Sequence, residues 1–71
     1  MEESLEELRQ TEIECLKRFR MKASEIKAQH PEMSQQIAFA KAVTALPKTA
    51  DRYQYARQRL MFAGYPALPL R

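Results

Sequence analysis

Residues 4–29 read SLEELRQTEIECLKRFRMKASEIKAQ, and this stretch decides the fold of the chain. It contains neither Pro nor Gly and is rich in Glu, Leu, Arg, Lys and Ala, which favour helix. Ser4 and Glu7 match the S-x-x-E capping box that begins many helices. The apolar positions recur at spacings of three and four, with a break at Thr11 and Glu12, as a helix packed on one side requires: Leu5, Leu8, Cys15, Leu16, Phe19, Ala23 and Ile26. We therefore expect one long helix over 4–29.

A second helix follows a break at His30 and Pro31, because Pro removes an amide and disfavours helical geometry in the residue before it. It begins either with Pro31 as its first residue or with Ser34 as its cap, and it runs to Pro47. Its residues are apolar on nearly every side and include many Ala, which allow helices to approach closely. We therefore expect this helix to be the central, buried element.

The third helix is expected from Thr49, as its N-cap, to about Ala63, with Gly64 at the left-handed position after its end. One face should meet the core: Tyr53, Ala56, Leu60 and Ala63. Residues 65–71 contain two Pro and should form an extended tail. The prediction is an all-α fold, a small three-helix bundle with a long first helix, in which residues 1–64 form a single domain and residues 65–71 an extended Pro-containing C-terminal tail.

The composition narrows the class of protein. In a chain of only 71 residues, a single hydrophobic core supplies about 3–5 kcal/mol of folding stability. Binding or self-association is therefore expected to contribute to the stability of the protein. The single Cys excludes an intramolecular disulfide and fits a reducing cytoplasm. No apolar run reaches the length of a signal peptide or a membrane span, so we expect a cytoplasmic protein with no membrane contact.

Catalytic machinery is not expected, and neither is a metal or a cofactor. One Gly and one His cannot supply a phosphate loop, a catalytic triad or a zinc site. Cys15 lies within the apolar stripe and is interpreted as a core residue, and His30 as a helix-end residue. The acidic side chains of the first helix are interpreted as a solvated face: Glu2, Glu3, Glu6, Glu7, Glu12 and Glu14.

The charge is unevenly distributed along the chain. Residues 1–14 hold six Glu and one Arg, a net charge of −5, while residues 15–71 carry +8. Such polarity suits a surface that meets an anionic partner, or two copies packed head to tail.

The third helix carries the candidate binding residues. Arg52, Tyr55, Arg59 and Phe62 recur at helical spacing and mix cations with aromatic rings, which are the types enriched at interface hot spots. Lys48 and Arg57 are expected to add electrostatic support. This pattern predicts a small regulatory or adaptor protein, of the inhibitor or modulator type, that binds a larger protein partner. The structural alternative is that Tyr55 and Phe62 cover the first helix or pack under the C-terminal tail.

Three alternatives stay open. The order of a helix, a short turn and a basic helix loosely resembles a helix-turn-helix, which predicts a DNA- or RNA-binding regulator, although the turn has Pro where Gly is usual. A homodimer through the first helix or the third is the second alternative. The third is recognition of residues 66–71, PALPLR, by an SH3 domain, since they match P-x-x-P-x-R.

Overall fold

The computed structural model describes residues 4–64 and contains three helices in this part of the chain. They are α1 (Leu5–Gln29), α2 (Gln35–Ala45) and α3 (Pro47–Phe62). The predicted all-α bundle with a long first helix is confirmed. The predicted tail, residues 65–71, lies outside the described residues, as do Glu2 and Glu3.

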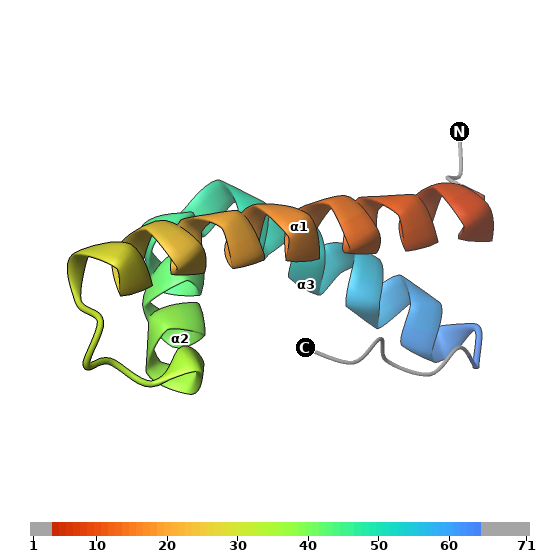
Figure 1. Ribbon diagram of the computed structural model, residues 1–71. Coiled ribbons are helices and arrows are strands. Elements are labelled where there is room, and N and C mark those ends of the chain that lie inside the picture. Colours follow the sequence, from red (N-terminus) through yellow and green to blue (C-terminus); the bar gives the residue numbers. More distant parts are fainter. Residues whose placement is uncertain (1–3, 65–71) are drawn as a thin grey trace.

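The helix at the centre is α1, so the prediction that the second helix is the buried element was wrong. Both α2 and α3 pack on α1, and they touch each other much less (Figure 1). Only Ala38 and Ala42 are buried on α2, and Ile37 is 53% exposed. The physical reason is helix length. Because α2 has 11 residues and α1 has 25, only α1 is long enough to pack against both of the other helices.

The resulting molecule is elongated. It measures 43 × 20 × 14 Å, and its radius of gyration of 13.2 Å exceeds the value of about 11 Å that a compact chain of this length would have. In Figure 1, α2 crosses the C-terminal part of α1, whereas α3 runs back toward the N-terminal end of α1. Because α2 and α3 lie as a single layer on α1, little of their surface is buried, and much of both helices is exposed.

The core consists of three clusters along one side of α1. Near its beginning, Leu8 packs with two residues of α3, Ala56 and Leu60. At its end, Ala23 packs with two alanines of α2. The central cluster joins all three helices: Cys15, Leu16 and Phe19, with Phe39, Val43, Leu46, Ala50 and Tyr53 against them.

Phe19 is the centre of this middle cluster. Its ring is 1% exposed and meets Phe39 of α2 and Tyr53 of α3 edge to face, each at 5.8 Å between ring centroids. Edge-to-face pairs add stabilisation beyond the burial of area. Phe19 therefore holds both shorter helices on the long one.

Two of the three helices, α1 and α2, begin at a capping residue that the sequence predicts. Ser4 caps α1 by accepting a hydrogen bond from the Glu7 amide at 3.1 Å. Ser34, one of the two predicted starts, caps α2 by accepting from the Ile37 amide at 3.2 Å.

The predicted cap of the third helix, Thr49, was wrong, because α3 begins at Pro47 and has no side-chain cap. Pro suits a first helical position, since its fixed φ is helical and its missing amide would have no partner there. Thr49 is instead buried, at 7% exposure.

The end of α3 matches one expectation and contradicts another. Gly64 has φ of +86°, the left-handed geometry predicted for the residue after the helix. Ala63, predicted for the core face, is exposed; it is the C-cap residue, which follows the last helical residue, Phe62. His30 occupies the C-cap of α1, where its backbone amide donates to the Ile26 carbonyl.

Over residues 4–64, no helix is both long and apolar enough to cross a membrane.

Candidate functional site

Five of the six predicted binding residues share the outer face of α3. They follow one another at intervals of four, three, four and three residues, which places them in one row along the helix: Lys48, Arg52, Tyr55, Arg59 and Phe62. All five are exposed. We call this row the α3 ridge. Ala56 and Leu60 lie one residue, and so about 100° around the helix, beyond Tyr55 and Arg59. Both are fully buried against α1, so the packing of α3 leaves the ridge toward solvent.

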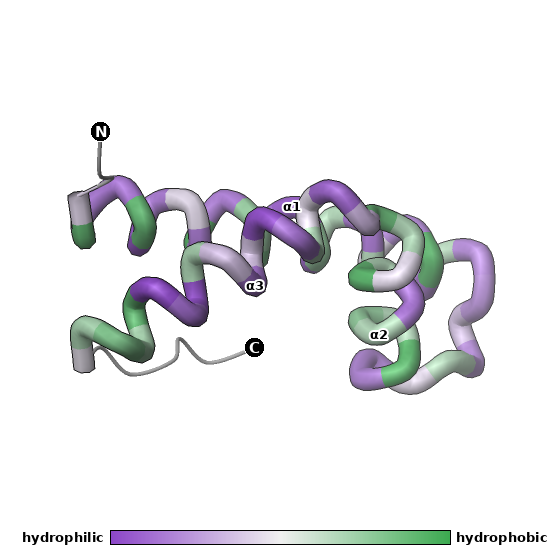
Figure 2. The backbone as a smooth tube through the Cα atoms, turned by 180° about the vertical axis from the view of Figure 1, so that it is seen from behind, coloured by the Kyte–Doolittle hydropathy of each residue, from purple (hydrophilic) through white to green (hydrophobic). Residues whose placement is uncertain are grey.

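The aromatic part of the α3 ridge exposes a large apolar surface. Phe62 is 89% exposed and Tyr55 is 47% exposed, and the neighbouring Met61 is 61% exposed. Figure 2 shows the change along α3, from hydrophilic residues over most of its length to hydrophobic ones in its last turn. Large apolar side chains grouped on a small protein commonly mark an interaction surface.

The cationic part is interleaved with the aromatic one. The guanidinium carbon of Arg59 lies 5.4 Å from the centroid of the Tyr55 ring, within cation–π range. This contact holds both side chains in place without removing them from solvent. Asp51 is the one acidic residue in the sequence of α3, so the helix surface is positive overall.

The sixth predicted residue, Arg57, lies apart from the α3 ridge. Its side chain is 22% exposed and points toward α1, where its Nη1 atom lies 3.6 Å from Oε2 of Glu12. Arg9 pairs with the other oxygen of the same carboxylate, at 2.7 Å between Nη1 and Oε1. Glu12 itself has no exposed surface, so its interpretation as a solvated residue was wrong.

A sequence pattern could have revealed this buried carboxylate. Glu12 follows Leu8 by four residues and precedes Cys15 by three and Leu16 by four. This spacing places it within the apolar stripe of α1 rather than on the solvated face. A charge at a buried position requires a partner of opposite charge, and Arg57 of α3 and Arg9 of α1 supply it.

Burial shifts the pKa of two titratable side chains that pack in the cluster of Phe19. Burial raises the pKa of the Cys15 thiol, and the smaller effects of Arg52 and Arg18 in the opposite direction do not overcome it. Burial also raises the pKa of Tyr53, with Glu12 adding to the increase. A nucleophilic cysteine requires a lowered pKa and access to substrate, and Cys15 has neither.

Comparison of the chain with protein-family models, curated proteins and solved structures finds no significant match. Within residues 4–64, no three His, Cys, Asp or Glu side chains lie close enough together to hold a metal ion.

Proposed function

We propose that this protein is a non-enzymatic regulator or adaptor that binds a larger protein through the α3 ridge. The observation that carries the proposal is the exposure of Phe62 and Tyr55 beside the cationic side chain of Arg59. Aromatic and Arg side chains contribute most of the binding free energy at many protein interfaces. The complementary partner surface has an apolar pocket for Phe62, and acidic groups that face the cations of the ridge.

Charge reversal on the α3 ridge is the test of this proposal. We expect R52E/R59E to weaken capture of the partner by at least about tenfold, since two contacting cations become repulsive. The far-ultraviolet circular dichroism spectrum and the melting temperature should stay close to those of the wild type, because exposed charges contribute little to stability. Quantitative mass spectrometry of pull-downs from the native cell measures the loss.

The matched control is K17E/R18E, which reverses two exposed cations on α1 and changes the net charge by the same amount. It should capture the partner as well as the wild type does. If K17E/R18E loses the partner to the same degree as R52E/R59E, net charge rather than the α3 ridge governs binding, and the proposal is wrong.

A nucleic-acid target is the second candidate, favoured by one specific observation. Lys48, Arg52 and Arg59 are all exposed along one helix face, as contacts to phosphates require. Against it, a helix-turn-helix needs two helices packed on each other, and α2 and α3 make few mutual contacts. The exposed Phe62 is also better matched to a protein pocket than to a phosphate backbone.

A titration with duplex DNA separates the two candidates. For a protein-binding α3 ridge, we expect no saturable binding at low salt. Tight binding at low salt that weakens steeply as salt rises, with a smaller salt slope for R52E/R59E, would instead favour the nucleic-acid candidate, because released counterions produce that dependence.

A further inference from the structure

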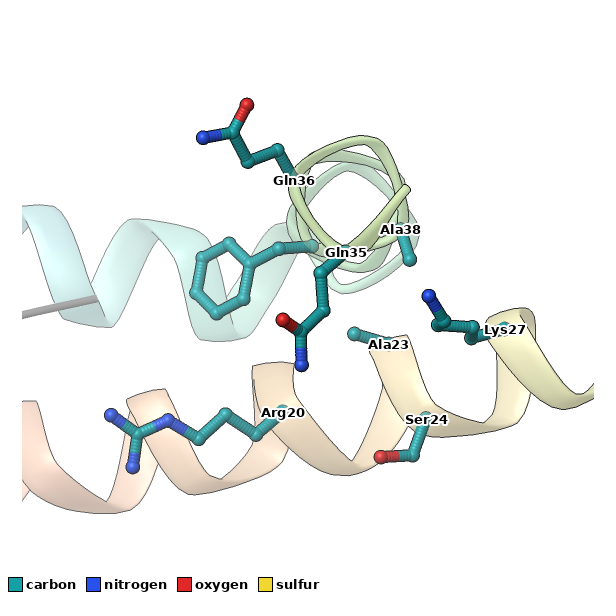
Figure 3. Close-up of a pocket in the computed structure, with 8 residues that line it drawn as sticks. Arg20, Ala23, Ser24, Lys27, Gln35, Gln36 and Ala38 are labelled. Carbon is teal, nitrogen blue, oxygen red and sulfur yellow. The ribbon is translucent and has the colours of Figure 1, made fainter. Parts of the chain in front are cut away.

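A second surface lies away from the α3 ridge, in an open groove between the C-terminal half of α1 and the beginning of α2 (Figure 3). Its floor is apolar and includes Ala23, Ala38 and Phe39. The rim is polar and cationic, with Arg20, Lys27 and Gln35. In Figure 3, Lys27 extends from α1 toward α2, and Gln35 extends from α2 toward α1.

The groove has a marked charge preference. Two cationic side chains line it, and none of the described residues that line it is acidic. Lys27 donates one hydrogen bond to the Met33 carbonyl at 3.2 Å, and an ammonium group has three N–H donors. A segment with acidic groups next to an apolar side chain would match both the rim and the floor.

The chain itself carries such a segment, in the first turn of α1. Leu5 is 40% exposed and is followed by the exposed Glu6 and Glu7. These residues cannot reach the groove of their own molecule, because both lie on one continuous helix. Eighteen residues separate Glu6 from Ser24 at the groove, which is about 27 Å along a helix that rises 1.5 Å per residue. Any contact between them is therefore between two molecules.

We propose that the acidic first turn of α1 of one molecule docks in the groove between α1 and α2 of a second copy. Leu5 covers the apolar floor, and Glu6 and Glu7 face Arg20 and Lys27. The two surfaces differ, so the contact is head to tail, and it leaves one acidic end and one groove open at the ends of each assembly. Association then continues beyond the dimer as concentration rises. This interface shares no residue with the α3 ridge and does not depend on the function proposed for that ridge.

Sedimentation velocity of the full chain, over a range of concentrations at low and high salt, tests the proposal. We expect the average mass of the wild type to rise with concentration at low salt and to return to the 8.3 kDa monomer at high salt, because salt screens exposed charges. A wild type that stays monomeric at every concentration in low salt overturns the proposal.

Two variants each remove one side of the contact. E6Q/E7Q neutralises the acidic end, and Q35E/Q36E adds acidic groups at the groove. Q35E/Q36E also places negative charge in the first turn of α2, where the helix dipole favours it, so loss of fold would not explain loss of association. Each variant alone should remain monomeric, with an unchanged circular dichroism spectrum.

The mixture of the two variants gives the sharpest result. E6Q/E7Q keeps an intact groove and Q35E/Q36E keeps an intact acidic end, so an equimolar mixture should form 1:1 dimers and nothing larger. The control K17Q/R18Q changes the net charge as Q35E/Q36E does but lies outside the groove, and it should associate like the wild type. A monomeric mixture, or a control that also fails to associate, overturns the proposal.

Discussion

Glu12 lies between Leu8 and Cys15 on the buried side of α1, with its carboxylate against the guanidinium groups of Arg9 and Arg57. Oε2 of Glu12 and Nη1 of Arg57 are buried and have no hydrogen-bond partner, so these two atoms attract each other across 3.6 Å as an ion pair without a hydrogen bond. The cluster joins α1 to α3 between the apolar cluster of Leu8 and that of Phe19. A buried ion pair of this kind stabilises little on balance, but removing one partner leaves the other uncompensated.

Replacing the buried carboxylate tests this account. We expect E12Q to lower the free energy of unfolding by about 3 kcal/mol, the low end for a broken buried pair, because both guanidinium groups keep some contact with water. The control E14Q removes an exposed carboxylate two residues away and should change stability by less than about 0.5 kcal/mol. Urea denaturation measures the free energy of unfolding of both variants. Equal losses in E12Q and E14Q would show that the ion pairs of Glu12 do not hold the fold together.

The protonation of Cys15 and Tyr53 predicts how stability changes with pH. Both pKa values are raised in the folded state, mainly by burial, so the folded state holds both protons more tightly than the unfolded state does. Their contribution is complete below the ordinary thiol pKa of 9.0, and it is lost as pH rises through the raised folded-state values. We expect the melting temperature to fall above about pH 9, and to fall less in C15A. A C15A profile parallel to that of the wild type would contradict this assignment.

At the scale of the elements, the three helices follow from local residue types. The capping serines, the breaks before prolines and the glycine after α3 could all be predicted, because each acts within a few residues of its own position. The start of α3 was predicted at Thr49 and lies at Pro47, and Thr49 is buried in the fold instead of capping the helix. The peripheral position of α2 in the bundle could not be predicted from local residue types either. An apolar composition says that a helix can be buried, but not whether its neighbours are long enough to cover it.

Removal of the α2 cap tests the element on which the groove depends. In S34A the Ile37 amide loses its acceptor, and we expect a loss of about 1 kcal/mol of stability. The control S24A makes the same chemical change inside α1, where Ala is the better helix former, so it should be neutral or slightly stabilising. Thermal melts of the two variants should therefore shift in different directions, and a common shift would contradict the capping role of Ser34.

For the whole molecule, the single layer of helices on α1 explains both the small core and the exposed surfaces. The sequence could predict the members of the α3 ridge, because a row at helical spacing is a local property. Helical spacing also places Arg57 off this row, but its pairing with Glu12 could not be predicted, because that contact joins residues 45 positions apart. Nor could the sequence place the groove, which exists only where α2 crosses α1. The two surfaces lie apart, so the proposed protein partner and the proposed second copy would occupy separate places on the molecule.

The central claim is that the α3 ridge is the partner-binding surface, and site-specific photo-crosslinking tests it most directly. A photoreactive phenylalanine analogue is placed at position 62 in one protein and, as the control, at position 21, where Met21 is 72% exposed on α1. After irradiation in the native cell, the analogue at position 62 should give a discrete adduct heavier than a dimer of the chain. The same adduct should be absent from position 21 and should disappear from position 62 when R52E/R59E is added. Equal crosslinking from both positions, or none from position 62, would contradict the claim.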